Sequence, residues 1–517
     1  MKKILYSALF LATILACNDL LDVKPENAVT YTNFFQTEKD FGQANAELYA
    51  RLREIYFTYS RQNPHDVIGL RYDSQNAHGV YPDELKSLLP QAFKEQGALS
   101  WSIHYAAIFQ ANLILDNLYR AIDVPDGRLD FYAGHAHFVK GLVYYEIARR
   151  WGDAPVPTTT KEIQTLGRTP AAELLDTARA NARKAFDLLA PYREQVDHRG
   201  IPTYKHYGHK AAAAALLANI HAWRAGRFGI TADYEETNRY CSMIINGELG
   251  DFRLEDSPEE VCTNKGADGL LSNESVFELV NLAADFNGGF TTGHYHIGIG
   301  YHMGDTYSYG AFPFNPLEDQ ENQNKYFNYY LLNNATVKAI WDADDKRRQA
   351  YFYNFDFYNA KWGDNEPAYP YFWRQVVVDP SWNEIVNLLG NRIFWRLADL
   401  YLLRAEARCR ANIPGADDDL NVVRNRANAA PYPAPGDNQG LQMAIFRERE
   451  KELFFDGERY YDIVRNDYYR LPGMISEAFE QLSDDDVQGG ALYVPVSDDV
   501  FANNTKMRRN PFWLSRW

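Results

Sequence analysis

Apolar residues recur at every third or fourth position along nine stretches of this chain, and that spacing predicts amphipathic α-helices. In the first stretch, Phe41, Ala44, Leu48 and Leu52 would share one face of the helix. The predicted helices cover Thr37–Ile55, Ala98–Ile122, Phe131–Trp151, Thr169–Leu189, Lys205–Ala225, Tyr234–Ile245, Trp395–Ala411, Asp417–Ala429 and Gln439–Arg465. The pattern therefore predicts a mainly α fold.

Local signals set the predicted ends of several helices. Gly152, closely followed by a proline, predicts the end of the third helix. Thr169 stands where a capping residue would, with Pro170 at the first helical position of the fourth helix. Gly226 is predicted to end the fifth helix, whose Ala211–Ala215 run lets a second helix approach closely. The fifth and sixth helices then form a helix–turn–helix unit of roughly tetratricopeptide-repeat (TPR) size.

Long segments between the helices lack this periodicity. The stretch 59–97 is polar and loop-like, 283–330 is rich in Gly, Tyr, Phe and Asn, and 350–396 indicates loops with short strands. The end of the chain, 492–517, is predicted to be extended. Because helices flank the loops on both sides without a linker, we predict one domain over 37–517. It would be a TPR-like helical-repeat scaffold with long inserted loops and a few short strands.

The N-terminus has the pattern of a secretory signal. It begins with Lys2 and Lys3, continues with a mostly apolar run to Ala16, and is followed by Cys17. This order is typical of a bacterial lipoprotein, so residues 1–16 are predicted to be a signal peptide and 17–36 a tether lipidated at Cys17. The alternatives are an ordinary signal peptide with an incidental cysteine and a short membrane anchor. The apolar run is too short to span a bilayer.

Composition narrows the class of function. Without the two N-terminal lysines the chain carries 51 basic and 69 acidic residues, a net charge of about −18. Such a body binds nucleic acid poorly, because attraction to phosphate supplies most of the non-specific affinity. After Cys17 the chain has three cysteines, Cys241, Cys262 and Cys409, and none of them belongs to a CxxC motif. Three cysteines can form at most one disulfide. Aromatic residues make up 15% of the chain and Tyr outnumbers Phe. This indicates rings that are half buried, with the tyrosine hydroxyl in contact with water.

Two groups of residues resemble catalytic or metal sites. Glu448 and Glu452 stand in a segment of alternating charge and look like an acid pair, but the i,i+3 and i,i+4 spacing favours structural ion pairs. His294 and His302, at the ends of an HxHx₅H pattern beside Asp305, offer metal-ligating atoms without a complete ligand set. We therefore predict no metal and no cofactor. The sequence contains no P-loop, GxSxG or HExxH motif.

A tyrosine-rich segment is the strongest candidate for a ligand site. Rings recur there with Gly and Asn between them, at Tyr295, Tyr301, Tyr307, Tyr309 and Phe312. A flat ring covers the apolar C–H face of a sugar, while neighbouring polar groups bond its hydroxyls. We therefore predict that these residues bind a carbohydrate. The alternative for any one of these rings is a local loop core.

Four tryptophans outside this segment are also considered as ligand platforms. Trp101 is expected in the helix core. Trp341, Trp362 and Trp373 are possible late-loop platforms, with the core as their expected place.

Several segments, in order and over almost the whole chain, resemble the SusD/RagB family of outer-membrane nutrient-binding lipoproteins. They are Leu21–Pro25, Trp101 to Asn112, KGLVYYEIARRWGDAPVP at Lys140–Pro157, RLADLYLLRAEA at Arg396–Ala407, LNVVRNRA at Leu420–Ala427, the ER…EL…G.R..D..R pattern from Glu448 to Arg465, and Tyr493–Pro495. Asp456 replaces the usual Glu before Gly457, and Arg509 replaces the customary Gln near the end.

The resemblance implies a TPR-type scaffold that presents a loop-built binding face on the cell surface. Family members cap a TonB-dependent, SusC-like outer-membrane barrel and deliver to it an oligosaccharide or, in the RagB branch, a peptide. They are binders and not enzymes. By position, the resemblance adds four ligand-contact candidates from an early loop: Arg71, Tyr72, Asp73 and Asn76. The binding loops are then expected at about 60–100 and 283–390.

The sequence thus predicts a lipid-anchored protein of the outer membrane and cell surface. It would capture oligosaccharide or polysaccharide and deliver it to a partner transporter, without binding nucleic acid. A peptide- or protein-binding RagB-like uptake lipoprotein is the alternative. A surface glycosidase is a further alternative, but it needs two carboxylates paired across a cleft, and no partner is evident for the loop aspartates.

Overall fold

The computed structural model describes residues 34–57, 63–75, 82–95, 100–263, 272–280, 330–372, 374, 376–379, 384–388, 391–502 and 504–517. Over these ranges the chain is mainly α-helical with a few short strands, which confirms the predicted class. Among the described residues, no helix combines the length and apolar character needed to cross a membrane. Cys17, Asn76, Trp373, the histidine group and the tyrosine-rich segment lie outside these ranges.

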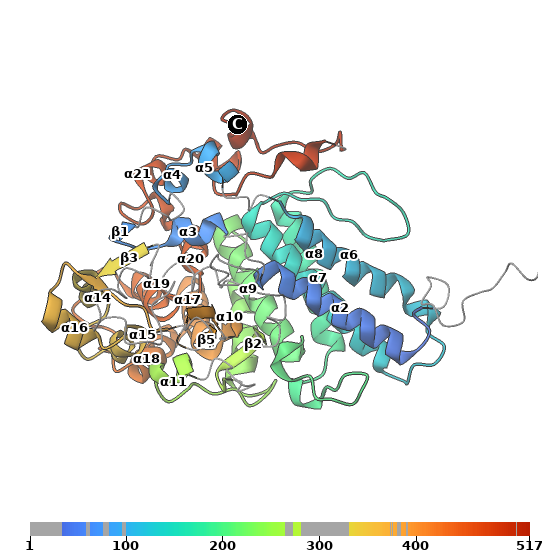
Figure 1. Cartoon of the computed structure of the whole chain (residues 1–517), viewed down its shortest axis with the longest axis horizontal. Helices are drawn as coiled ribbons and strands as arrows, with labels where there is room; N and C mark the ends of the chain where they lie inside the picture. Colours follow the sequence, from blue (N-terminus) through green and yellow to red (C-terminus); the bar gives the residue numbers. More distant parts are fainter. Residues whose placement is uncertain are drawn as a thin grey trace, which may run out of the picture.

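The helices form a curved array in which each packs on its neighbours along the chain (Figure 1). The first part of the array is α2 (Glu38–Phe57), α6 (Ser102–Asn117), α7 (Arg128–Arg150), α8 (Ala171–Leu188), α9 (Lys210–Phe228) and α10 (Asp233–Ile245). The second part is α17 (Leu397–Ala411), α18 (Ala416–Arg426), α19 (Leu441–Glu452) and α20 (Arg459–Arg465). Because α10 packs against α17, the two parts form a continuous scaffold. This arrangement confirms the helical-repeat prediction.

Shorter elements lie between and after these helices. The stretch predicted as loop at 59–97 contains three short helices, and 350–396 contains a helix besides its strands. The additional elements are α3 (Pro64–Gly69), α4 (Pro82–Lys86), α5 (Pro90–Glu95), α11 (Pro258–Thr263), α14 (Asn334–Ile340), α15 (Lys346–Tyr351), α16 (Phe355–Trp362), α21 (Glu477–Glu480), α22 (Asp484–Gln488), α23 (Pro511–Leu514) and the 3₁₀ turns η1 (Leu118–Arg120), η2 (Tyr192–Glu194), η3 (Tyr204–His206), η6 (Tyr468–Arg470) and η7 (Asp498–Phe501).

The strands of the described chain form three small antiparallel sheets. The first sheet has the order β1 (Ser74–Gln75), β3 (Tyr330–Asn333), β4 (Pro367–Ala368). The second pairs β2 (Ser275–Leu279) with β7 (Arg392–Arg396), and the third pairs β5 (Val376–Asp379) with β6 (Glu384–Leu388). Ser74 pairs with Leu331, and Leu332 pairs with Ala368. The three-stranded sheet therefore fixes the point where segment 281–329 rejoins the described chain, beside the early loop.

Two predicted helix ends are wrong because another residue does the capping. Pro170, not Thr169, occupies the N-cap position of α8, and the carboxylate of Asp153 accepts a hydrogen bond from the Ala171 N–H at 2.8 Å. Helix α9 begins at Lys210, where the His209 ring caps it by accepting from the Ala212 N–H. Both caps use a side chain that the sequence pattern did not single out.

The predicted helix Gln439–Arg465 is two helices. Helix α19 ends at Glu452, and α20 begins at Arg459. Gly457, with φ of +82°, turns the chain between them. Glycine adopts this left-handed conformation more readily than residues with a side chain, so the break follows from a residue inside the predicted helix.

Gly226 does not end α9. The helix continues to Phe228, and Gly229, with φ of +69°, forms its C-cap. A Cβ added at Gly226 would lie 2.2 Å from the carbonyl oxygen of Arg465, the last residue of α20. The role of Gly226 is therefore to let α20 approach α9, whose Ala211–Ala215 run is likewise fully buried.

This close approach predicts that Gly226→Ala lowers the free energy of unfolding by about 1–3 kcal/mol, because the backbone of α20 has to move. Guanidinium unfolding followed by circular dichroism measures the change. Gly436→Ala is the matched control, since a Cβ there meets no atom within 4 Å. Equal stability of the two variants would show that α20 does not rest on Gly226.

Buried ion pairs fasten the C-terminal helices, which confirms the structural interpretation of Glu448 and Glu452. Glu452 pairs with three arginines, Arg347, Arg396 and Arg426, and Glu448 pairs with Arg347 and Arg424. These partners come from α15, β7 and α18 and not from the i,i+3 or i,i+4 positions of α19. Because these side chains are buried, the acids hold separate elements together.

The large aromatic residues divide between core and surface. Trp101 and Trp341 are buried, as expected, whereas Trp362 is only half buried.

Cys241, Cys262 and Cys409 are free thiols in the structure. Cys241 and Cys262 are buried and Cys409 is half buried.

Candidate functional site

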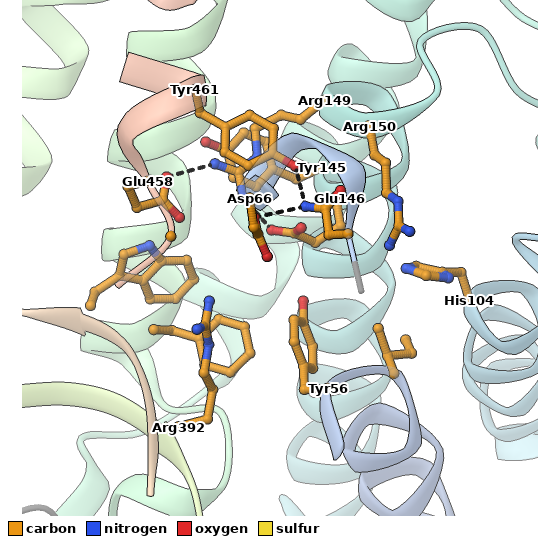
Figure 2. Close-up of a pocket in the computed structure, with 15 residues that line it drawn as sticks. Tyr56, Asp66, His104, Tyr145, Glu146, Arg149, Arg150, Arg392, Glu458 and Tyr461 are labelled. Atoms are coloured by element: carbon orange, nitrogen blue, oxygen red, sulfur yellow. Dashed lines mark hydrogen bonds and ion pairs between the residues drawn. The ribbon is translucent and has the colours of Figure 1, made fainter. Parts of the chain in front are cut away.

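A small polar cavity lies where α2, α3, α7, β7 and α20 meet (Figure 2). Asp66, Glu146, Tyr56 and Arg392 point toward one another from different elements in this view. Arg149 closes one wall, with its guanidinium 3.0 Å from Glu458 and 2.5 Å from Glu146. The walls are therefore lined by charges of both signs.

Burial perturbs the acids of this cavity. It raises the pKa of Asp66 to about 7, against the lowering effect of Arg392 and Arg150. Burial also raises the pKa of Glu458. Carboxyl groups with a shifted pKa in a pocket are a common sign of an active site. Such a site also needs room for a ligand, so the size of the cavity has to be considered.

The cavity is too small for a sugar. Its volume is about 60 Å³, whereas a cavity that admits benzene measures roughly 150 Å³. A hexose ring does not fit in a cavity of this size. The cavity is of a size that holds a few water molecules between buried polar groups.

A second hollow has the size of a ligand site. This α19 cleft has a volume of about 620 Å³, within the range of about 300–1,000 Å³ typical of ligand pockets. It lies between α14, the segment 429–440 and α19. Its charged lining includes Arg71, Asp342, Arg447 and Lys451. The segment 429–440 contributes Asp437 and Gln439 together with small residues: Ala429, Ala430, Ala434, Pro435, Gly436 and Gly440.

Three of the early-loop candidates are described, and they have different surroundings. Arg71 lines the α19 cleft. The Tyr72 hydroxyl donates to Asp83 at 2.6 Å, and the Lys86 ammonium lies 4.3 Å from the centre of the Tyr72 ring. Asp73 accepts from the Asn333 N–H at 2.6 Å and from the Thr336 hydroxyl at 2.8 Å, so it ties the early loop to the junction of β3 and α14. Their contact with a ligand stays a prediction.

A group of aromatic side chains surrounds α16, with Phe357 exposed, Tyr358 buried and the other three rings half buried. We call Tyr353, Phe357, Tyr358, Trp362 and Tyr369 the α16 aromatic surface. The ring planes of Tyr358 and Trp362 are 29° apart with centroids separated by 4.9 Å, and those of Tyr353 and Tyr358 are 26° apart at 6.0 Å. Phe357 is 60% exposed. Lys361 lies 5.3 Å from the Trp362 ring and so adds a cation to the rings.

The sheet β1–β3–β4 connects these parts. Helix α16 contacts β4 at one edge of the sheet, and the Arg71–Asp73 segment leads into β1 at the other edge. Helix α14 follows β3 directly and reaches the α19 cleft with its last residues, Ala339 and Ile340. The early loop, the α19 cleft and the α16 aromatic surface are therefore built around one small sheet.

Comparison with known proteins identifies the family. A family model described as "SusD family" matches residues 316–513, and one described as "Starch-binding associating with outer membrane" matches residues 19–221. SusD-like protein P25 of Formosa agariphila is 26% identical over 521 residues, covering 90% of this chain and 89% of the relative. The chain belongs to the SusD-like family.

Solved structures of other proteins share this SusD-like fold. A SusD homolog from Bacteroides thetaiotaomicron superposes with a TM-score of 0.73 at 20% identity, over 93% of this chain and 99% of that chain. Surface glycan-binding protein A from the same organism superposes with a TM-score of 0.64 at 17% identity, over 92% of this chain and 99% of that one. These superpositions show that the fold is shared, while the two family models confirm the resemblance seen in the sequence motifs.

Sequence reasoning missed most of the described part of the candidate site. Trp362 was a possible platform, but Phe357 and the α19 cleft were not singled out. The FDFYNAKW segment of α16 did carry a signal, since its rings at positions 355, 358 and 362 follow helical spacing and leave Phe357 on another face. Among the described residues, no group of three His, Cys, Asp or Glu side chains is placed to hold a metal ion.

Proposed function

We propose that this SusD-like protein binds a glycan at the outer membrane. One family model that it matches is described as starch-binding and associating with the outer membrane, and one structural neighbour is a surface glycan-binding protein. The α16 aromatic surface carries the proposal for this chain. Phe357 is exposed and Trp362 is half buried, and these two rings offer apolar faces beside the Lys361 ammonium.

The chemistry of these groups suits a sugar. The C–H face of a pyranose packs on an exposed ring such as Phe357 or Trp362, while Lys361 and the tyrosine hydroxyls bond its hydroxyl groups. Tyr295, Tyr301, Tyr307, Tyr309 and Phe312, on the segment that rejoins the sheet at β3, would add further rings. We also propose contacts from Arg71, Tyr72, Asp73 and Asn76. Affinity should be modest, because binding displaces water from many hydroxyls.

The proposal includes a partner and an anchor. Lipidation of Cys17 would hold the protein on the cell surface, and a TonB-dependent, SusC-like barrel would receive the glycan. We propose no catalysis. In the ligand-sized α19 cleft, Asp437 is bound by Arg424, Glu448 by Arg424 and Arg347, and Glu450 by Arg447 and Arg459. Arginine-bound acids are poor proton donors and nucleophiles.

The double variant Phe357→Ala with Trp362→Ala tests the α16 aromatic surface. We expect roughly a tenfold to hundredfold loss of polysaccharide affinity, since each stacked ring contributes about 0.5–1.5 kcal/mol beyond its buried area. Isothermal titration calorimetry on the soluble body, residues 18–517, measures the loss. Phe109→Ala is the control, because Phe109 is a similarly exposed ring (54%) on α6. Full affinity in the double variant would remove α16 from the binding site.

A further inference from the structure

The chemistry of the α19 cleft differs from that of the α16 aromatic surface. None of the described residues that line the cleft is aromatic, so a sugar ring has no flat platform there. The lining is also balanced in charge. It contains four basic residues, Arg71, Arg424, Arg447 and Lys451, and four acidic residues, Asp342, Asp437, Glu448 and Glu450. Because neither sign of charge is in excess, the cleft favours an uncharged ligand over an anion or a cation.

Three polar side chains of this lining are available to a ligand. Among the described residues, the side chains of Asp342, Gln439 and Lys451 have no partner in a hydrogen bond or an ion pair. Asp342 and Gln439 are exposed, and Lys451 is half buried. The carboxylate accepts hydrogen bonds, the ammonium donates them, and the amide does both. A hydroxyl group also does both, so a ligand rich in hydroxyls can bond to all three side chains.

The wall of the cleft formed by the segment 429–440 is held in place by α18. Arg424 of that helix donates two hydrogen bonds to the carboxylate of Asp437, at 2.7 and 2.9 Å. The side-chain amide of Asn421, also on α18, bonds both the N–H and the carbonyl of Tyr432, at 2.6 and 3.2 Å. The cleft is therefore formed before a ligand arrives, which lowers the entropy cost of binding.

Helix α14 connects the cleft to the neighbourhood of the α16 aromatic surface. Both α14 and α16 contact β4. From the sheet, α14 runs for seven residues, or about 10 Å, and its last residues, Ala339 and Ile340, line the cleft. In Figure 1, α16, α14 and α19 follow one another from the left edge toward the centre. A polysaccharide bound on α16 therefore has the cleft within reach along α14.

We propose that the α19 cleft is a second glycan subsite, which takes a short uncharged stretch of the polysaccharide that the α16 aromatic surface holds. The inference rests on the proposed function. It adds a subsite that bonds hydroxyl groups where α16 covers ring faces. Once one site is occupied, binding at the other is intramolecular, so one glycan chain that reaches both sites binds more tightly than either site alone would allow.

Titration calorimetry of the soluble body, residues 18–517, tests the proposal. The cleft variant combines Asp342→Ala, Gln439→Ala and Lys451→Ala, and it is compared with the double variant Phe357→Ala with Trp362→Ala. The probes are whole polysaccharides and short oligosaccharides of starch, mannan and laminarin. Oligogalacturonate serves as the anionic probe and oligoglycine as the peptide probe.

For a neutral glycan that binds, we expect its short oligosaccharide to occupy two sites on the parent and one site on each variant. The cleft variant should bind the whole polysaccharide about tenfold more weakly, because a second site of roughly 0.1 mM affinity no longer meets its segment at roughly 1 mM effective concentration. Asp126→Ala with Lys184→Ala is the matched control. Both residues are exposed outside the cleft, so this variant should keep both sites.

Each outcome decides the proposal. A parent with one oligosaccharide site, or a cleft variant that keeps two, would show that the cleft is no subsite, while capture on α16 stands. If the cleft variant instead loses binding of oligogalacturonate or oligoglycine and of no neutral glycan, the cleft takes a different class of ligand and the proposal is wrong. A parent that binds none of the saccharides would overturn the proposed function, and the second subsite with it.

Discussion

Replacement of Glu452 by glutamine is expected to lower the free energy of unfolding by about 3–5 kcal/mol, the usual cost of breaking a buried ion pair. Glu452 is fully buried, and its carboxylate pairs with Arg347, Arg396 and Arg426. Glutamine keeps the shape of the side chain but removes the charge. The three arginines then lose the carboxylate that they share, in the protein interior where water cannot hydrate them.

Glu236→Gln is the matched control for this variant. Glu236 pairs with Arg239 within α10, and both side chains are about 40% exposed, so its loss should cost less than about 1 kcal/mol. Guanidinium unfolding of the two variants beside the parent measures both values. A cost for Glu452→Gln as small as that of the control would show that the buried network does not fasten α19.

The same network predicts how stability depends on pH. Arg426, Arg396 and Arg347 hold the pKa of Glu452 far below its usual range although burial opposes them, and Arg465 likewise lowers the pKa of Glu406 to about 2. Groups with a depressed folded-state pKa stabilise the fold above the unfolded pKa, about 4.3 for glutamate. That stability should be lost as the pH falls from about 4.3 toward 2. Glu452→Gln should show a smaller loss over this range.

Replacing the five rings of the tyrosine-rich segment together is expected to reduce glycan affinity by at least about a hundredfold. Alanine at Tyr295, Tyr301, Tyr307, Tyr309 and Phe312 removes stacking of about 0.5–1.5 kcal/mol from each ring that touches the sugar. Three contacting rings at about 1 kcal/mol each are enough to give this loss. Calorimetric titration with the polysaccharide that the parent binds measures it.

The matched control replaces exposed tyrosines elsewhere. Tyr119 and Tyr204 are exposed on other parts of the body, and their combined change to alanine should leave glycan affinity within about twofold, since neither belongs to the proposed site. Circular dichroism of the five-ring variant checks that its helical content is kept. A five-ring variant with the affinity of the parent would mean that these residues form a local core.

The sequence predicted the scaffold well because its helices bury a regular face. Phe41, Ala44, Leu48 and Leu52 are all buried on α2 as their spacing indicates. The ends were less predictable, because they depend on partners distant in the chain. Gly226 looked like a stop signal, yet it is the contact point for α20, a helix more than two hundred residues later.

The site was harder to predict than the scaffold for a similar reason. Arg71 was singled out by position, but the cleft that it lines is completed by α19 and the segment 429–440. Asp73 looked like a ligand contact, and only the fold shows that its carboxylate is bonded to Asn333 and Thr336 at the start of α14. Trp362 was expected in the core, whereas the stack that it forms with Tyr358 leaves it half exposed. Contacts between elements are not visible as periodicity.

Capture of a glycan is the central claim, and binding of the soluble body, residues 18–517, to parallel panels of polysaccharides and oligopeptides tests it most directly. The account predicts saturable binding to at least one polysaccharide, which is recovered uncleaved, and no binding to the peptides. Binding to oligopeptides with no binding to any glycan would contradict it and assign the protein to peptide uptake.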